Sequence, residues 1–180
     1  VEEGYERELF EHWVDADGDG CDTRQEVLIA ESLTPVTVGA GCAIEGGSWF
    51  SAADGDTLTN PASVDINHVV PLKEAWASGA HAWTPEERRA FANDLTDERT
   101  LQAVSSGANR QQGEHDPASW LPADLEAACQ FVADWVAIKA SWGIAVDQAE
   151  RGAIELTLQN CGERMVTVVP REPVEPTAGS

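Results

Sequence analysis

Three stretches of the chain repeat apolar residues at the spacing of an amphipathic helix. Residues 124–142 carry the longest apolar stripe, and residues 147–160 follow after the helix-ending Gly143. Residues 4–14 predict a third helix, whose apolar face comprises Leu9, Phe10, Trp13 and Val14. We therefore expect two helices near the end of the chain and one at its start.

Start signals mark two further helices. Thr23 and Glu26 have the spacing of a capping box, which predicts a helix over residues 23–33 that a following proline ends. The run Thr84-Pro85-Glu86-Glu87 combines an N-cap, a first-turn proline and acidic residues. It lies within residues 72–110, whose pattern predicts helices with breaks.

Residues 36–69 instead alternate apolar and polar positions and contain turn signals, as β-strands do. Gly46-Gly47 and Asp54-Gly55 are the turn signals, and a short apolar strand at 64–70 ends at a proline. Residues 101–104 form another short apolar element. The whole pattern predicts an α+β fold in which helices surround a small antiparallel hairpin.

The length of 180 residues suits a single domain, which we expect over residues 1–164. Residues 165–180 contain three prolines and a Gly-Ser end, and are expected to form a loose tail. No run approaches the ~18 apolar residues of a membrane-spanning helix, so no membrane partner is expected. The lack of a basic-then-apolar leader fits a mature secreted protein.

The chain has four widely spaced cysteines, which form no C-x-x-C pair. An even number without metal-binding spacing favours two disulfides and an oxidising, extracellular compartment. Of the three possible pairings we expect Cys21–Cys42 and Cys129–Cys161, because each pair joins neighbouring segments. Four reduced, buried thiols are the alternative.

The net charge of −21, taken alone, argues against a nucleic-acid partner, because phosphate binding calls for Lys and Arg. The charge is uneven, however: residues 1–72 hold 15 acidic and 2 basic residues, whereas residues 73–110 hold 6 and 5. Only two of the 11 basic residues are Lys. Because an acid-rich, Lys-poor surface is a feature of salt-adapted proteins, we expect a salt-tolerant protein.

The segment Asp65-Ile66-Asn67-His68-Val69-Val70-Pro71-Leu72 places polar residues inside an apolar strand. Such a cluster is costly to bury unless its groups are paired or hold a ligand. A lone histidine at a strand end is more often structural, and this is the alternative interpretation. Here, however, His68 is accompanied by Asp65 and Asn67.

This segment resembles the first half of an HNH nuclease motif, in which an acidic residue directly precedes the catalytic His. Residues 101–113 resemble the second half, a β-turn into a helix that carries Asn109 and Arg110. Other matching pieces make about residues 10–161 similar to the secreted actinobacterial branch of HNH endonuclease-like proteins. These pieces are residues 17–24, 47–49, 72–76, 78–80, 91–95 and 116–120.

The resemblance implies a ββα-metal core and an extracellular endonuclease that cleaves DNA, with RNA as an open alternative, to 5′-phosphate ends. It implies that His68 is the general base and that Arg110 clamps the phosphate. It further implies that Asn67 and Asn109 hold one Mg²⁺ or Mn²⁺ ion. No helix has the basic spacing that reads a base sequence, so little sequence preference and no obligate protein partner are expected.

The chain departs from the family pattern at three positions. Most relatives have Asp where this chain has Asn67, and they tend to have Lys at the position of Gln112 and Asp at that of Glu114. Because an amide is a weaker cation ligand than a carboxylate, we expect an extra ligand. Asp65, Glu114 or His115 could supply it, and Asp65 comes first because it shares a strand face with Asn67.

Four carboxylates have the spacing of an EF-hand calcium loop: Asp15, Asp17, Asp19 and Glu26. The expected helices at 4–14 and 23–33 would flank this loop. A structural Ca²⁺ site and a solvated acidic turn pinned by the disulfide of Cys21 stay open as alternatives. So does a place for Arg24 and Glu26 at the active site.

Two other functions stay open. One is a catalytically silent calcium-binding or interaction protein on the HNH scaffold, which the acidic surface and Asn67 favour. The other is a metal-dependent phosphodiesterase that acts on small phosphates. Cleavage of plasmid DNA and of nitrophenyl diesters separates the three.

Overall fold

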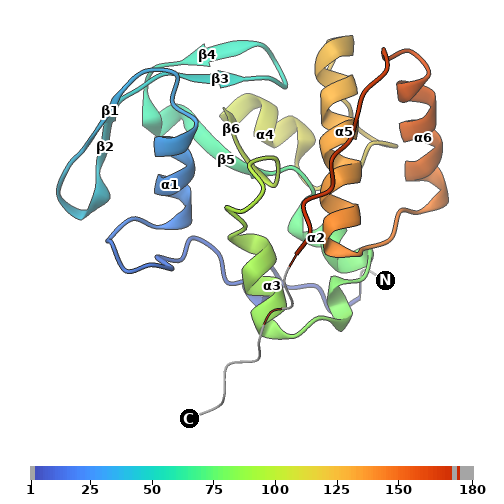
Figure 1. Ribbon diagram of the computed structural model, residues 1–180, viewed down its shortest axis with the longest axis horizontal. Coiled ribbons are helices and arrows are strands. Elements are labelled where there is room, and N and C mark those ends of the chain that lie inside the picture. Colours follow the sequence, from blue (N-terminus) through green and yellow to red (C-terminus); the bar gives the residue numbers. More distant parts are fainter. Residues whose placement is uncertain (1–2, 172–173, 175–180) are drawn as a thin grey trace.

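The computed structural model describes residues 3–171 and 174. Helix α1 and short antiparallel hairpins lie on one side of the molecule, and helices α5 and α6 lie on the other (Figure 1). The predicted α+β architecture is confirmed, but the described residues form three separate two-stranded sheets rather than one hairpin. None of the described helices has the length and apolarity to cross a bilayer.

All three sheets are antiparallel pairs. They pair β1 (Val36–Val38) with β2 (Ile44–Gly46), β3 (Trp49–Ser51) with β4 (Asp56–Leu58), and β5 (Val64–His68) with β6 (Leu101–Ser105). The turn between β2 and β3 requires Gly47, whose φ is positive and where an added Cβ would collide with the ring of Trp49. In the β5–β6 sheet, His68 pairs with Leu101 at the end of β5.

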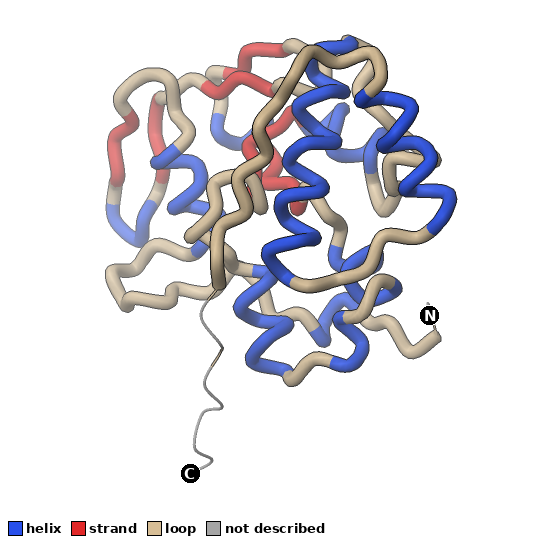
Figure 2. Tube along the Cα trace, turned by 45° about the vertical axis from the view of Figure 1, so that its right-hand side comes forward, coloured by secondary structure: helices blue, strands red, loops and turns tan. Residues whose placement is uncertain are grey.

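The helices are short apart from α5, which is evident where helices and strands are coloured separately (Figure 2). They are α1 (Thr23–Ala30), α2 (Leu72–Ala77), α3 (Pro85–Ala92), α4 (Ser106–Gln112), α5 (Leu125–Trp142) and α6 (Gln148–Leu158). Single 3-10 turns occur at η1 (Arg7–Leu9), η2 (Ala40–Cys42), η3 (Pro61–Ser63) and η4 (Ala80–Ala82).

The predictions of α3, α5 and α6 are confirmed, caps included. Thr84 and Asp147 each form a capping box with a Glu three residues on. Gly143 ends α5 in a left-handed conformation with φ of 64°. These signals succeed because they act within one turn of helix.

The helix predicted over residues 4–14 is wrong, because only Arg7–Leu9 forms a single 3-10 turn. Phe10 is fully buried against α2, α3 and α5, whereas Trp13, at a positive φ of 59°, packs toward α1 and the hairpins. One helical face cannot supply both contacts. Tertiary packing therefore overrides the helical spacing of this segment.

The cap and the end of α1 also differ from the prediction. The N-cap is Asp22, which forms a capping box with Gln25, because the hydroxyl of Thr23 donates instead to Val14 and Asn93. The helix ends at Ala30 rather than near residue 33. Past this end, the carboxylate of Glu31 accepts the backbone N–H of Ala103.

The core consists of two clusters that meet near the end of β5. One lies among α2, α3, α5 and α6, and the other lies between α1 and strands β3, β5 and β6. The His68 ring touches both, since it lies 5.6 Å from the Trp13 ring and stacks 6.5 Å from that of Phe91. The strand end that carries the predicted catalytic residue is therefore braced from two sides.

The predicted disulfides are confirmed, and the alternative of reduced thiols is wrong. Cys21 is bonded to Cys42, which ties the loop before α1 to the β1–β2 hairpin. Cys129 is bonded to Cys161, which ties α5 to the end of α6. Among the described residues no cysteine is free.

The part of the predicted loose tail that the structure describes is held in place. Residues 165–171 run along α5 (Figure 1), where Ser141 donates to the carbonyl of Val169. Arg171 pairs with buried Asp94 and lies 3.5 Å over the ring of Trp142. These contacts hold part of residues 165–171 against the domain, whereas 172–173 and 175–180 lie outside the described residues, so the loose tail stays a prediction. The boundary at residue 164 stays a prediction.

Candidate active site

A cavity of about 350 Å³ opens beside β5 and the helix that follows β6. It brings together most of the predicted site residues, although they come from distant parts of the sequence. The N-terminal segment, β5, the start of α2 and α4 all contribute. The lining residues are Tyr5, Arg7, Ile66, Asn67, His68, Pro71, Leu72, Lys73, Asn109, Arg110, Gly113 and Glu114.

Chain geometry explains why this cavity forms where it does. Strand β5 delivers Asn67 and His68 at its last two positions, and Ser105 at the end of β6 caps α4 by accepting the N–H of Ala108. The cap starts the helix at once, so Asn109 lies one turn from the hairpin. Two strands and one helix thus bring the two halves of the motif together.

The imidazole of His68 is buried and held by one hydrogen bond. Its Nε2 lies 2.9 Å from the carbonyl oxygen of Ala92. A carbonyl can only accept, so Nε2 carries the proton and Nδ1 keeps its lone pair. The ring is therefore fixed in the tautomer that a general base requires.

The same surroundings keep His68 neutral. Burial lowers its pKa to about 4, against the opposing effect of the Ala92 hydrogen bond, and the charges of Arg7 and His12 lower it further. A neutral imidazole at Nδ1 can accept a proton from water throughout the neutral pH range.

A chain of hydrogen bonds sets the orientation of Asn67. Gln112 Nε2 donates to the carbonyl of Val69 at 2.9 Å, so its Oε1 faces Asn67 and accepts from Nδ2 at 2.8 Å. Asn67 must therefore turn its Oδ1 away from Gln112. Two of the three positions at which the chain departs from the HNH pattern, Asn67 and Gln112, are thus in direct contact.

Asn109 is oriented by the same logic. Its Nδ2 donates to Asp65 Oδ2 at 2.9 Å, and the other oxygen of Asp65 accepts from Ser106. A carboxylate can only accept, so Asn109 presents Nδ2 to it and keeps Oδ1 for another partner. Asp65 itself does not line the cavity, and it orients Asn109 through this hydrogen bond.

The donor set fits a hard divalent cation, but a weakly bound one. Asn67 and Asn109 are each oriented through their own Nδ2–H groups, which leaves both Oδ1 atoms free, and oxygen is the ligand that Mg²⁺ and Mn²⁺ prefer. Both carboxylates nearest this pair are engaged: Asp65 by two donors, and Glu114 by Lys73 at 3.2 Å. A phosphate oxygen of the substrate would supply the negative charge that the two neutral amide ligands lack.

The cavity rim is basic although the chain is acidic. Three of its lining residues are basic and one is acidic. Arg110 follows Asn109 on α4 and is exposed, as expected for a phosphate clamp. The cavity is also lined by Tyr5, Arg7 and Lys73, for which the sequence predicted no role. One signal for Arg7 was available, since it is one of only two basic residues before position 73.

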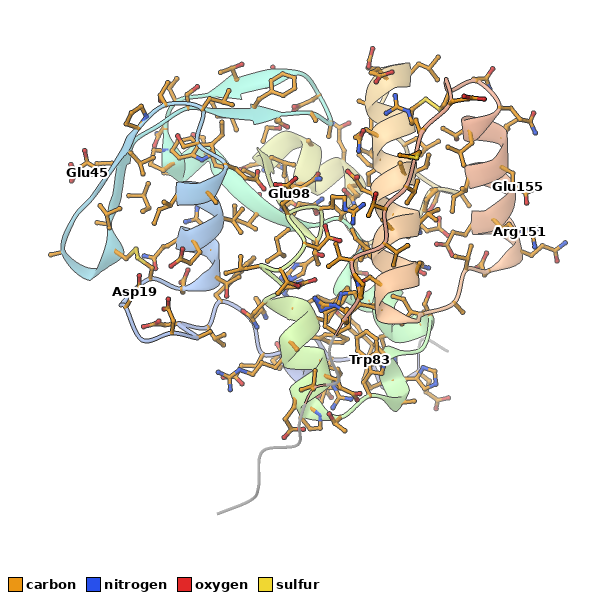
Figure 3. All side chains as sticks on the ribbon, viewed as in Figure 1. Asp19, Glu45, Trp83, Glu98, Arg151 and Glu155 are labelled. Atoms are coloured by element: carbon orange, nitrogen blue, oxygen red, sulfur yellow. A yellow bond between two sulfur atoms is a disulfide. The ribbon has the colours of Figure 1, made fainter. Side chains whose placement is uncertain are left out.

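The acidic loop lies elsewhere in the molecule, before α1, where Figure 3 labels Asp19. Carboxylate oxygens of Asp15, Asp17 and Asp19 lie within 4.8 Å of one another, and those of Asp19 and Glu26 lie equally close. The loop has the predicted carboxylates but not the EF-hand architecture, because no helix enters it.

Arg24 and Glu26 do not lie at the cavity. The Arg24 guanidinium donates to the backbone carbonyls of Pro61 and Val64. Glu26 faces the acidic loop, where burial and then the charges of three Asp residues raise its pKa. The alternative that placed both residues at the active site is therefore wrong.

Together these features define a small, disulfide-linked α+β domain with a buried histidine, two oriented amides and a basic rim in one cavity. Comparison with protein families matches residues 45–154 to the family described as GmrSD restriction endonucleases, C-terminal domain. The match spans more than half of the chain, including β5, β6 and α4. The chain belongs to this family, and its relationship is therefore with nucleases.

A relative from Arthroderma benhamiae is 40% identical over 160 residues, which cover 89% of this chain and 77% of that protein. It is described as an uncharacterized secreted protein. Because this relative is fungal, a restriction of the chain's relatives to actinobacteria is not supported. No solved structure matches the chain.

Proposed function

We propose that this chain is an extracellular, metal-dependent HNH-type endonuclease that hydrolyses DNA with little sequence preference. The observation that carries the proposal is that His68, Asn67 and Asn109 line one cavity with three basic side chains. The match to a family of restriction endonuclease domains supports the nuclease class. The antiparallel β5–β6 pair followed by α4 supports a ββα-metal core.

His68 is the proposed general base. Its Nδ1 takes a proton from a water molecule, and the bond of Nε2 to Ala92 keeps the ring in place while the charge on the imidazole changes. The water attacks the phosphorus in line with the 3′ oxygen, which leaves. Breakage of this bond gives products with 5′-phosphate ends.

Asn67 and Asn109 are the proposed ligands of one Mg²⁺ or Mn²⁺ ion through their Oδ1 atoms. When bound, such an ion supplies Lewis-acid stabilisation of charge on the scissile phosphate and on the leaving oxygen. Arg110 donates paired hydrogen bonds to the phosphate. Asp65 orients Asn109, and Glu114 stays available as a further ligand if it leaves Lys73.

An extracellular location is supported by the two disulfides and by the secreted relative. The acidic, Lys-poor composition supports salt tolerance. We expect cleavage to persist at about molar NaCl, and collapse of activity there would reject this part of the proposal.

Incubation of supercoiled plasmid with the purified chain and Mg²⁺ or Mn²⁺ tests the nuclease directly. Nicked and then linear plasmid is expected, with no cleavage in excess chelator, and end-labelling should show 5′-phosphates. Cleavage of bis(p-nitrophenyl) phosphate without plasmid cleavage would favour a small-substrate phosphodiesterase. No hydrolysis of either would favour a catalytically silent protein. Single-stranded RNA as a third substrate settles the DNA preference.

A further inference from the structure

The N-terminal segment contributes to the cavity although it lies outside the residues matched to the family. Tyr5 and Arg7 line the cavity, whereas the match begins at residue 45. The proposed base, cation ligands and Arg110 all lie inside the matched region. Tyr5 and Arg7 are therefore an addition to the matched core, and their role needs its own explanation.

Packing and hydrogen bonds hold this segment against the rest of the molecule. Phe10 is fully buried, and Arg88 Nε donates to the carbonyl of Leu9 at 3.2 Å. The Trp76 indole N–H donates to the carbonyl of Glu3, and its ring packs 6.2 Å from that of Tyr5. Contacts on both sides of Arg7 thus hold its backbone at the mouth of the cavity.

No carboxylate of the described residues forms a salt bridge with Arg7. Among residues 3–171, neither Arg7 nor Arg110 has an acidic partner within salt-bridge distance, whereas Lys73 pairs with Glu114. Burial raises the pKa of Tyr5, and the nearby charge of Arg7 opposes the rise, so the phenol and the guanidinium lie close together. A guanidinium and a phenol side by side are donors that suit phosphate oxygens.

Arg7 and Arg110 approach the cavity from different sides. Arg110 follows the cation ligand Asn109 on α4, whereas Arg7 comes from the N-terminal segment and its charge acts on the His68 ring. The scissile phosphate must lie between His68 and the amide oxygens for the proposed reaction. One phosphodiester carries a single negative charge, which a divalent cation and Arg110 already more than balance.

We propose that Tyr5 and Arg7 form a second phosphate subsite that binds a neighbouring phosphate of the same nucleic-acid strand. This inference rests on the proposed nuclease function and deepens it, because it makes polynucleotides the preferred substrate class. A small diester has no second phosphate and cannot use the subsite. The subsite thus determines specificity through binding and takes no part in bond breakage.

The test compares Arg7→Gln with Arg151→Gln, a charge-matched control on the outer face of α6 (Figure 3). We expect Arg7→Gln to lower kcat/KM for a short DNA duplex about tenfold more than for bis(p-nitrophenyl) phosphate, mainly through KM. On a His68→Ala background, the slope of log binding constant against log salt should fall by about one on removal of Arg7. Arg7→Lys should restore most of that slope.

Three results would overturn the subsite. Arg7→Gln could match Arg151→Gln on both substrates, so that Arg7 binds nothing. It could lower activity equally on duplex and small diester, which would place Arg7 at the reacting phosphate. The salt slope could stay unchanged. Failure of the nuclease itself is distinguishable, because the wild-type chain would then leave plasmid uncleaved, whereas failure of the subsite leaves wild-type plasmid cleavage intact.

Discussion

The two sides of the β5–β6 sheet differ in the charge of the side chains around them. On the cavity side, amide oxygens are surrounded by Arg7, Lys73 and Arg110. On the α1 side, carboxylates gather in the loop at 15–19 together with Glu26 of α1. The first environment suits a phosphate with a cation between it and the protein, and the second suits a cation alone. A net charge of −21 conceals this difference, so total charge is a poor guide to the partner.

The two sides also differ in how their polar groups are satisfied. In the cavity, each amide has a fixed partner, and its orientation follows from groups that can only accept. On the α1 side, like charges face one another, and burial raises the pKa of Glu26 and raises that of Glu31 to about 7. The cavity is therefore preorganised, whereas on the acidic side carboxylates lie close together and the ionisation of Glu26 and Glu31 is disfavoured. The following predictions test this contrast, from the largest effect to the smallest.

Removal of the proposed base should have the largest effect. His68→Ala is expected to lower the rate of plasmid cleavage at least ~100-fold, the usual contribution of general base catalysis. His81→Ala is the control, because His81 is exposed and does not line the cavity. A melting curve for each variant separates loss of chemistry from loss of fold. Near-normal cleavage by folded His68→Ala would falsify the assignment.

The contact between Asn67 and Gln112 predicts a coupled pair. Asn67→Asp alone would place a carboxylate against Gln112 Oε1 at a buried position, and a flip of Gln112 would break its bond to Val69. We therefore expect no gain in cleavage from Asn67→Asp, although a carboxylate is the stronger cation ligand.

The double variant Asn67→Asp/Gln112→Lys should restore charge balance and cleave about tenfold faster than Asn67→Asp. A double-mutant cycle on cleavage rate and unfolding free energy should give a coupling of about 1 kcal/mol or more. A large gain from Asn67→Asp alone would contradict the coupling and mark the present chain as an impaired enzyme.

The acidic side should respond to calcium. We propose that Asp15, Asp17, Asp19 and Glu26 bind a structural Ca²⁺ ion, which would relieve their mutual repulsion. Millimolar Ca²⁺ over chelator should raise the Tm by a few degrees, at about 2 to 4 °C for each kcal/mol in a chain of this length. Asp17→Asn should abolish the shift, and Asp56→Asn, outside the loop, should keep it. An unchanged Tm for the wild-type chain would leave the loop as a solvated turn.

The smallest expected effect is a pH dependence of folding stability that comes from Glu31. Burial raises its pKa to about 7, with Glu98 adding to the rise and the Ala103 N–H opposing it. A carboxyl with a raised folded-state pKa holds its proton longer in the folded chain, so stability falls as pH rises from about 4.3 to 7 and then levels off.

Glu31→Gln keeps an acceptor for Ala103 and removes the titration. Its Tm should lie slightly above that of the wild-type chain at pH 5, just above the unfolded-state pKa of about 4.3, and a few degrees further above it at pH 8. Glu45→Gln, on exposed β2 (Figure 3), should show no such pH dependence. An equal Tm difference at both pH values would contradict the role of Glu31.

Local signals explain which parts of the site could be predicted. The polar run at 65–68 stands out within an apolar strand, the Asn109 helix was expected from the resemblance to the HNH motif, and the register of β5 with β6 brings the two together. The disulfide pairing followed from proximity along the chain. The helix expected at 4–14 failed because its apolar residues serve two separate core clusters, which periodicity does not reveal.

The sequence by itself determined the elements whose signals act over one or two helical turns, namely the capped helices α3, α5 and α6, and the residue types of the site. Only the tertiary structure decided that Asn67 uses its Nδ2 and keeps its Oδ1 free, because its partner Gln112 lies 45 positions away. The same holds for Arg7, which reaches the cavity through the burial of Phe10. A hydrogen bond or a charge contact depends on where two groups lie in space, and no local pattern encodes that distance.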